Sequence, residues 1–521
     1  MSRAAFGCVV VAALAVGLAF RLARLDLRPM HHDEANQAVK FGGLLEKGDY
    51  RYDRNDHHGP TLYYLTLPAA WARGQATLAS LDERTLRAVP ALFGAGLILL
   101  FLPLARGLGR PAVAAAALLA ACSPVLTYYS RFYIQESIFA FFALAFLIAA
   151  GRFAERPGYA PAVWAGLSAG LAYATKETSL VVLPVVVSAA WLARATTKPA
   201  EGRNPAERPV TAGRYAAYAA AGAVSALAVA FVFYSSFLRH PGGLLESTRA
   251  FGIYLNRGIE TGPHTQPFAY YARLLTYFSS GGLVWTEGLV LGLACLGMIA
   301  SARRTPIAAT GFWPRYLGLY ALLAFVAFSA IRYKTPWNVL PFYVGFVLMA
   351  GVGAAALLGG LTSRVWRGFA VVVLLAATGQ LAGQCWRASF RYPADPRNPY
   401  VYAHTVPDLL RLVQRVTAVA SLSAVGSAMP VYVIAGPYEQ WPLPWYLRRM
   451  TRVGYWTRAG DAGRLVDAPV VIASQDQAEA VGDALGDSYV QEVYGVRPDV
   501  ILTVYVERSL WDRLLAARGA R

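Results

Sequence analysis

Eleven long apolar runs constrain this 521-residue chain more than any other feature of its sequence. A helix needs about 20 mostly apolar residues to cross the hydrocarbon layer of a membrane. Only 15% of the residues are charged, whereas a typical soluble domain has about 25%. The sequence therefore predicts an α-helical polytopic membrane protein with about eleven transmembrane helices. The runs lie at residues 4–24, 86–105, 111–128, 134–151, 160–175, 178–194, 215–238, 281–300, 316–331, 337–359 and 366–385.

Charge predicts the orientation of these spans. The formal net charge is +18, yet the basic residues do not form one stripe with interleaved aromatic side chains, so a nucleic-acid partner is not expected. They collect in every even-numbered connection, and positive residues mark the cytoplasmic side of a membrane. The pattern predicts a multi-pass protein of the plasma (inner) membrane, with a cytoplasmic N-terminus and odd-numbered loops outside. The residues are Arg106, Arg110, Arg152, Arg156, Arg194, Lys198, Arg203, Arg208, Arg214, Arg303, Arg304, Arg315, Arg364 and Arg367.

The chain changes character after the last apolar run. Short β-type runs such as 470–474 alternate with stretches of helical spacing such as 476–486. None is long enough to cross a membrane as a helix. The sequence thus predicts a transmembrane domain at residues 1–385 and a small soluble α/β domain at residues 386–521, outside the membrane.

Polar motifs concentrate in the odd-numbered loops. The first such loop, residues 25–85, is the longest, whereas the inner loops hold Arg, Gly, Pro and little else. The outer face is therefore predicted to hold the chemistry. The motifs are His31-His32-Asp33-Glu34, Asn55-Asp56-His57-His58-Gly59-Pro60, Tyr128-Tyr129-Ser130-Arg131-Phe132-Tyr133-Ile134-Gln135-Glu136, Ala174-Thr175-Lys176-Glu177-Thr178-Ser179 and Arg332-Tyr333-Lys334-Thr335-Pro336-Trp337-Asn338.

Ionisable residues also stand at the predicted outer membrane boundary, where charges usually face a water-filled cavity or each other. Cations at this depth suit a lipid phosphate, whose tail would lie in the bilayer. Structural explanations are open as well. Asp33 or His32 could cap a helix through Ala35–Leu45, and Arg131 and Lys176 could be interface anchors. The boundary residues are Glu136, Lys176, Glu177, Glu287, Arg332 and Lys334.

Side chains of the first odd-numbered loop could also bind a metal. Their donor atoms suit Zn²⁺ or, with more oxygen ligands, Mg²⁺ or Mn²⁺. However, the loop has no HExxH spacing, and His57 and His58 could instead hydrogen-bond a carboxylate or a sugar hydroxyl. The candidate ligands are His32, Asp33, Glu34 and His58, with His31 and His57 beside them.

Five motifs, in this order, resemble the GT-C glycosyltransferases. These include the protein O-mannosyltransferases and the bacterial aminoarabinose transferases, which use polyprenyl-phosphate sugars. Within this superfamily, the set looks like the group named in archaea as flippase-activity-associated glycosylation proteins. The resemblance covers about residues 1–390. The motifs are His32-Asp33-Glu34-Ala35, His58-Gly59-Pro60 with Tyr63-Tyr64, Ser130-Arg131-Phe132, Thr175-Lys176-Glu177-Thr178 and Tyr333-Lys334-Thr335-Pro336-Trp337.

The resemblance implies a GT-C fold, in which the first odd-numbered loop forms amphipathic helices on the membrane surface. It also implies an inverting, single-displacement transfer of a sugar from a polyprenyl-phosphate donor to an acceptor hydroxyl. Asp33 would be the general base, and Glu34 would orient the acceptor or bind a metal. The donor phosphate would be held by Arg131, Lys176, Arg332 and Lys334. The other substrate-binding residues would be His32, His57, His58, Glu136, Glu177, Tyr333 and Trp337.

Two other functions stay open beside this enzyme with a glycan, lipid or protein acceptor. One is a transporter or flippase component that binds the lipid-linked sugar without chemistry, which would favour mid-span charges and inverted repeats. The other is a scaffold of a glycan assembly machine that holds its partners through residues 386–521. An aromatic and basic cluster in that domain either binds carbohydrate or docks onto the membrane core. It comprises Pro437, Trp441, Trp445, Tyr446, Arg448 and Arg449.

Overall fold

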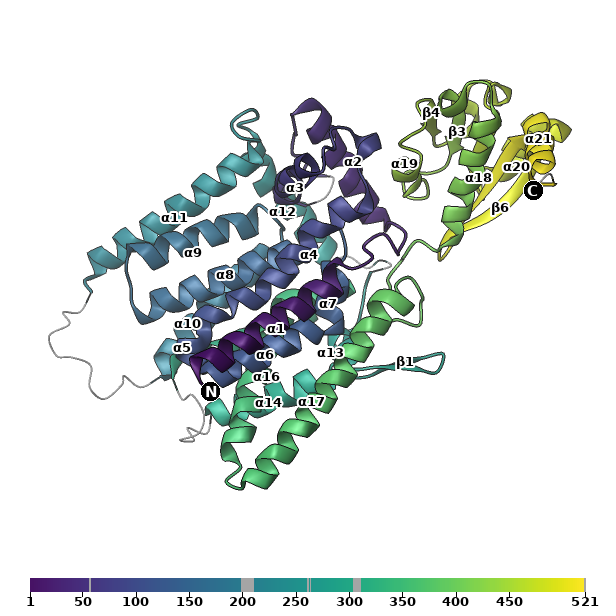
Figure 1. Ribbon diagram of the computed structural model, residues 1–521. Helices are drawn as coiled ribbons and strands as arrows, with labels where there is room; N and C mark the ends of the chain where they lie inside the picture. The colour runs from purple at the N-terminus through teal and green to yellow at the C-terminus, as the bar shows by residue number, and fades with distance from the viewer. Residues whose placement is uncertain (56–57, 198–209, 260–261, 263, 303–310, 520–521) are drawn as a thin grey trace.

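A computed structural model describes residues 1–55, 58–197, 210–259, 262, 264–302 and 311–519. Helices α1 to α17 form a bundle, and the C-terminal α/β region lies beside one end of it (Figure 1). A two-stranded hairpin, β1 (Phe278–Ser280) and β2 (Leu283–Trp285), interrupts the helices before α14. The helices are α1 (Arg3–Leu22), α2 (His32–Lys47), α3 (Thr61–Ala72), α4 (Glu83–Leu100), α5 (Ala105–Leu108), α6 (Arg110–Cys122), α7 (Pro124–Ser130), α8 (Glu136–Glu155), α9 (Tyr159–Tyr173), α10 (Ser179–Thr196), α11 (Ala212–Tyr234), α12 (Gly243–Ile259), α13 (Tyr270–Thr276), α14 (Gly288–Ala302), α15 (Phe312–Ala330), α16 (Leu340–Gly360) and α17 (Arg364–Trp386).

The number of candidate membrane-spanning helices is lower than the predicted eleven. Within the described residues, eight helices are long and apolar enough to cross a membrane, or nine if the bent pair α6–α7 counts as one span. Helices α9 and α14 have only 15 residues each. Helix α14 is short because Gly281 and Gly282 adopt positive φ angles of 52° and 78° and turn the start of the predicted 281–300 run into the β1–β2 hairpin. The prediction of a mostly helical membrane protein is confirmed, but the count of eleven is not.

Helix α2 begins with a capping box made by His31 and Glu34. The Nδ1 atom of the His31 ring accepts the N–H of Asp33 at 3.1 Å, and the Glu34 carboxylate accepts the N–H of His31 at 2.9 Å. The cap is thus His31, and neither His32 nor Asp33. Asp33 occupies the first turn, where the helix dipole stabilises a negative charge. Residues 23–31 connect the end of α1 to α2, so Asp33 lies at one end of the bundle, which we call the α2 end.

The C-terminal region contains a five-stranded mixed sheet with strand order β4-β3-β5-β7-β6. Strand β3 is parallel to β4 and β5, whereas β7 is antiparallel to β5 and β6. Separate apolar clusters cover its two faces, as the alternation of side chains along a strand requires. The predicted small α/β fold is confirmed. Its elements are α18 (Asp408–Leu422), β3 (Val431–Ile434), α19 (Leu443–Tyr446), β4 (Val453–Trp456), β5 (Val470–Ser474), α20 (Ala478–Leu485), β6 (Tyr489–Arg497), β7 (Val500–Glu507) and α21 (Arg508–Gly519).

A connecting segment, residues 387–407, joins the two parts. Tyr400 belongs to the apolar core of the helical bundle, whereas Leu409 belongs to the core of the C-terminal sheet. The connecting segment therefore packs with the helices, and the C-terminal core begins after it. The domain division after residue 385 stays a prediction.

The short helix α19 fixes the C-terminal region against the first loop of the bundle. The indole N–H of Trp445 donates to Glu83 at 2.8 Å, and the hydroxyl of Tyr446 accepts the N–H of Met30 at 2.8 Å. Arg448 donates to the carbonyl of Leu81 at 2.7 Å, and its guanidinium lies 3.6 Å from the centre of the Trp445 ring. These contacts favour docking over carbohydrate binding for this part of the aromatic cluster.

Candidate functional site

The centre of the α2 end is the carboxylate of Glu34, which is completely buried. Arg87 holds it in bidentate fashion, with bonds of 2.8 and 2.9 Å, and Arg28 lies 2.9 Å from one oxygen. The N–H groups of His31 and Tyr133 donate to the same carboxylate. Glu34 therefore joins α2, α4 and the turn before α8, and these five donors leave no oxygen for a metal or an acceptor. Glu34 was expected to be catalytic or to bind a metal, but its contacts indicate a structural role.

Asp33 faces a different environment from its neighbour. Its carboxylate is about one-quarter exposed and lies 3.1 Å from Nε2 of His32 and 3.6 Å from Nδ1 of His31. The His31 ring has a defined tautomer: Nδ1 accepts the N–H of Asp33, so Nε2 carries the proton that it donates to the carbonyl of Tyr402 at 3.1 Å. A neutral imidazole thus fixes the turn that presents Asp33.

The protonation of this turn predicts sensitivity to acid. Burial lowers the pKa of His31 to about 3, and the neighbouring His32 adds to this. Burial alone would raise the pKa of Glu34, but Arg28 and Arg87 hold it well below its usual value. Both pKa values are lower in the folded than in the unfolded chain. In the unfolded chain the pKa values are about 6.5 for His31 and 4.5 for Glu34. Each residue therefore contributes its full stabilisation above its unfolded pKa, and this stabilisation is lost as the pH falls below that value.

We expect the unfolding temperature to fall as the pH is lowered from 6.5 to 4.5. His31→Asn should reduce this fall, because an asparagine oxygen can keep the cap without titrating in this range. Part of the fall should remain, since burial also holds the pKa of His404 well below its usual value. His240, a partly exposed histidine beside Asp49, provides the control variant His240→Asn. Equal acid sensitivity in all three proteins, measured by thermal unfolding, would contradict this assignment.

A second group of site residues lies where the loop after α9 meets the first loop. Nδ1 of His58 and Oε2 of Glu177 are 2.6 Å apart, and the His58 ring stacks on Tyr254. Gly59 packs so closely on the carbonyl of Ala174 that a Cβ atom would lie 2.1 Å from that oxygen. This approach explains why glycine stands in the His58-Gly59-Pro60 motif. His57 lies outside the described residues.

Lys176 forms the next part of the site. Its ammonium pairs with the buried carboxylate of Glu136 and donates to the side-chain oxygen of Asn338 at 3.1 Å. The adjacent Trp337 packs its ring edge-on against His31, with ring centres 5.8 Å apart. The structure therefore brings the motif after α9 and the motif after α15 together with the start of α2. Glu136 and Glu177, which were expected to bind substrate, are thus paired with Lys176 and His58.

Two of the expected phosphate-binding residues are engaged by backbone carbonyls. The guanidinium of Arg131 donates to the carbonyls of Phe20, Arg21, Ala23 and Arg24, and so caps the C-terminal end of α1. Lys334 is buried, and its ammonium donates to the carbonyls of Gln266 and Ile331. Arg332, by contrast, is exposed and has no side-chain partner among the described residues. Tyr333 packs on His264.

The described metal-ligand candidates do not fit a protein-held Zn²⁺. Donor atoms of His31, His32 and Asp33 lie within 4.8 Å of one another. Both ring nitrogens of His31 are already hydrogen-bonded, however, and Glu34 has no oxygen to spare. His58 is paired with Glu177. Of the candidate ligands that the structure describes, this leaves His32 and Asp33, fewer than the three or four ligands that protein-held zinc requires.

Several residues of the site were not identified from the sequence. Arg28 and Arg87 could have been found. Arg28 is a basic residue in the predicted outer loop 25–85, against the positive-inside pattern, and Arg87 is an ionisable residue inside the predicted span 86–105. The segment containing Tyr402 and His404 carried no comparable signal. It lies along the site because Tyr402 accepts from His31 and Thr405 donates to Met30.

Glu287 supports the site from below. It is completely buried and accepts hydrogen bonds from the hydroxyl of Ser123 (3.0 Å), the N–H of Val125 (3.1 Å) and the hydroxyl of Tyr343 (2.5 Å). These contacts hold the bend between α6 and α7. Since α7 leads directly to Arg131, Glu287 stabilises the backbone on which the site is built.

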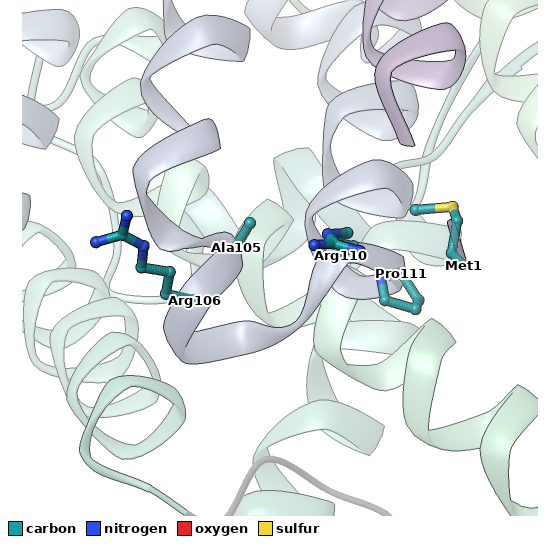
Figure 2. A pocket seen from close by; sticks show the side chains of 5 residues that line it. All are labelled: Met1, Ala105, Arg106, Arg110 and Pro111. Carbon is teal, nitrogen blue, oxygen red and sulfur yellow. The ribbon is translucent and has the colours of Figure 1, made fainter. Parts of the chain in front are cut away.

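A separate hollow of about 400 Å³ lies at the opposite end of α1, beside Met1 (Figure 2). Ala105 and Arg106 from α5, with Arg110 and Pro111 from the start of α6, complete its lining. Arg106 and Arg110 belong to the loops predicted to be cytoplasmic. The hollow therefore forms no part of the site at the α2 end.

Comparisons with known proteins agree with this architecture. The family model described as dolichyl-phosphate-mannose-protein mannosyltransferase matches residues 66–200, whereas a search of curated proteins gave no match. ArnT from Cupriavidus metallidurans bound to undecaprenyl phosphate is 18% identical, with a TM-score of 0.63 over 96% of this chain and 98% of that chain.

Two further solved structures share the fold. The Archaeoglobus fulgidus oligosaccharyltransferase in its apo form is 12% identical, with a TM-score of 0.58 over 98% of this chain and 77% of that chain. The S. cerevisiae protein O-mannosyltransferase complex bound to the sugar donor is 12% identical, with a TM-score of 0.53 over 80% and 92%. The resemblance inferred from the motifs is confirmed in the fold: this chain has the architecture of the GT-C membrane glycosyltransferases.

Proposed function

We propose that this protein transfers a sugar from a polyprenyl-phosphate donor to an acceptor hydroxyl at the α2 end of the bundle, on the outer face of the membrane. The observation that carries the proposal is the partly exposed carboxylate of Asp33, set by the His31 cap beside residues of the other outer-loop motifs. Two of the solved structures named above, one bound to undecaprenyl phosphate and one to the sugar donor, support the donor class.

The geometry suits a single displacement. Asp33 removes the proton of the acceptor hydroxyl while its oxygen attacks the anomeric carbon of the donor. The bond between that carbon and the phosphate oxygen breaks, and polyprenyl phosphate leaves with the electron pair. The configuration at the anomeric carbon is inverted, and Asp33 then returns its proton to solvent. The chain's own cations stabilise the negative charge of the leaving phosphate.

Arg332 and Lys176 are the residues we assign to that phosphate, whereas the ammonium of Lys334 already donates to two backbone carbonyls. The Arg332 guanidinium is exposed, whereas Lys176 uses two of its three donors on Glu136 and Asn338. Arg131 is not assigned to the phosphate, because its donors already hold the end of α1.

Arg332→Gln is expected to weaken the binding of polyprenyl phosphate about tenfold or more, because a charge-assisted hydrogen bond is lost. Binding would be measured by titrating undecaprenyl phosphate into the protein in detergent. Arg273→Gln serves as the control, since Arg273 is an exposed arginine on α13, in a different predicted outer loop. Equal affinity in both variants would remove Arg332 from the phosphate site.

The release of polyprenyl phosphate by the purified protein in nanodiscs tests the function itself. A panel of polyprenyl-phosphate sugars would be supplied with and without a glycan-containing membrane extract. Transfer predicts that one donor releases polyprenyl phosphate only when the extract is present. Saturable binding of a donor without release would instead favour the transporter or scaffold function.

A further inference from the structure

The loop between β3 and α19, residues 435–442, reaches from the C-terminal sheet toward the start of α2. Its far end is fixed, because α19 is anchored to Met30 and Glu83. Figure 1 shows α19 on the side of the C-terminal region that faces α2. A loop held at both ends in this position forms part of the surroundings of Asp33.

Arg497, at the end of β6, fixes the conformation of this loop. The side chain of Arg497 is buried, and its guanidinium donates to the carbonyl of Trp441 at 2.9 Å and to the carbonyl of Tyr438 at 2.6 Å. The same guanidinium lies 3.9 Å from the centre of the Tyr438 ring. The backbone and the ring of Tyr438 are therefore both held by one cation.

Tyr438 is nevertheless 58% exposed. Arg497 covers one part of the ring, and the ring centre lies 5.8 Å from that of His32, in an edge-on arrangement. His32 in turn lies 3.1 Å from the carboxylate of Asp33. The exposed ring of Tyr438 is thus separated from Asp33, the base assigned above, only by the side chain of His32.

We propose that Tyr438 determines acceptor specificity by packing its open surface against a sugar ring of a glycan acceptor. This inference rests on the proposed function, because it assigns the acceptor side of the same site. A sugar presents C–H groups on its ring faces and hydroxyls at its edge. An aromatic ring beside polar groups matches that distribution.

The surroundings of Tyr438 favour a carbohydrate over a lipid acceptor. Its sequence neighbours in the loop, Glu439 and Gln440, are polar, and His32 and Arg497 complete the polar surroundings. A lipid chain would instead need a continuous apolar lining. The aromatic surface of Tyr438 and the polar side chains beside it suit a single sugar ring at the end of a glycan. The reacting hydroxyl of that sugar would face Asp33.

Binding of methyl glycosides tests this assignment without requiring transfer. Saturation-transfer NMR would be recorded with a panel of methyl hexosides and methyl pentosides and with the protein in nanodiscs. At least one glycoside should bind the wild type through its ring C–H protons. Affinity should fall about five- to tenfold in Tyr438→Ala and be kept in Tyr438→Phe. Tyr277→Ala is the matched control, because Tyr277 is 62% exposed but lies beside the β1–β2 hairpin.

Undecaprenyl phosphate binding, measured on the same samples, separates this inference from the donor assignment. It should be equal in all four proteins. Failure of the donor to bind the wild type, together with the expected glycoside pattern, would contradict the proposed function and leave the role of Tyr438 standing. Binding of no glycoside, or equal binding of a glycoside by Tyr438→Ala and the wild type, would overturn the role of Tyr438.

Discussion

Replacement of Glu34 by glutamine is expected to lower the free energy of unfolding by about 3–5 kcal/mol, because it leaves buried cations without their counter-charge. Arg28 and Arg87 are both buried and share this one carboxylate. Glutamine keeps the size of the side chain but supplies one acceptor oxygen in place of two. Thermal unfolding in detergent, or the yield of folded protein after size exclusion, measures the effect.

Two further variants separate lost charge from lost packing. Asp26→Asn removes an exposed carboxylate paired with Arg84 in the same loop, and it should cost at most about 1 kcal/mol. Combining Glu34→Gln with Arg87→Met should be less damaging than the sum of the single changes, since one unpaired cation is removed. Stability of the Glu34→Gln protein close to that of the wild type would show that Glu34 is not the centre of this network.

The helical core was predictable because hydrophobicity alone specifies it. Each apolar run of the sequence contains a helix in the structure. Errors arose where local backbone preferences compete with hydrophobicity, as at Gly281 and Gly282, where positive φ angles replace the start of a span by a hairpin. The mixed sheet order of the C-terminal region was not predictable, because strand pairing depends on contacts distant in sequence.

The candidate site was predictable in its location but not in the partners of its residues. The Asp-Glu pair and the later motifs do meet at one end of the bundle. Which member of the pair is buried, however, depends on Arg87, 53 residues further along the chain. Arg131 and Lys334 were assigned to a phosphate from their residue type, whereas the structure uses their donors on carbonyls. The residues next to Glu34, Arg131 and Lys334 in the sequence do not indicate which groups these side chains contact in the fold.

Asp33→Asn is expected to reduce sugar transfer about 10²–10⁴-fold, the usual contribution of a positioned general base. Asparagine keeps the shape of the side chain and the N–H that His31 accepts, so the start of α2 should be preserved. The loss should therefore appear in kcat, with the KM for the donor nearly unchanged. Polyprenyl-phosphate release by the protein in nanodiscs, at saturating donor and with the acceptor-containing extract, provides the rate.

The same assay of Asp26→Asn controls for removal of a negative charge from this loop, and that variant should keep its activity because Asp26 is paired with Arg84 away from Asp33. A tenfold loss in donor affinity without a loss in kcat would make Asp33 a donor ligand. Unchanged release in Asp33→Asn would move the base to another residue, and Glu34 would not qualify, because both of its oxygens already accept bonds from Arg28, Arg87 and two backbone N–H groups. A base that acts on an acceptor must be reachable and ionised, and of the pair only Asp33 is reachable.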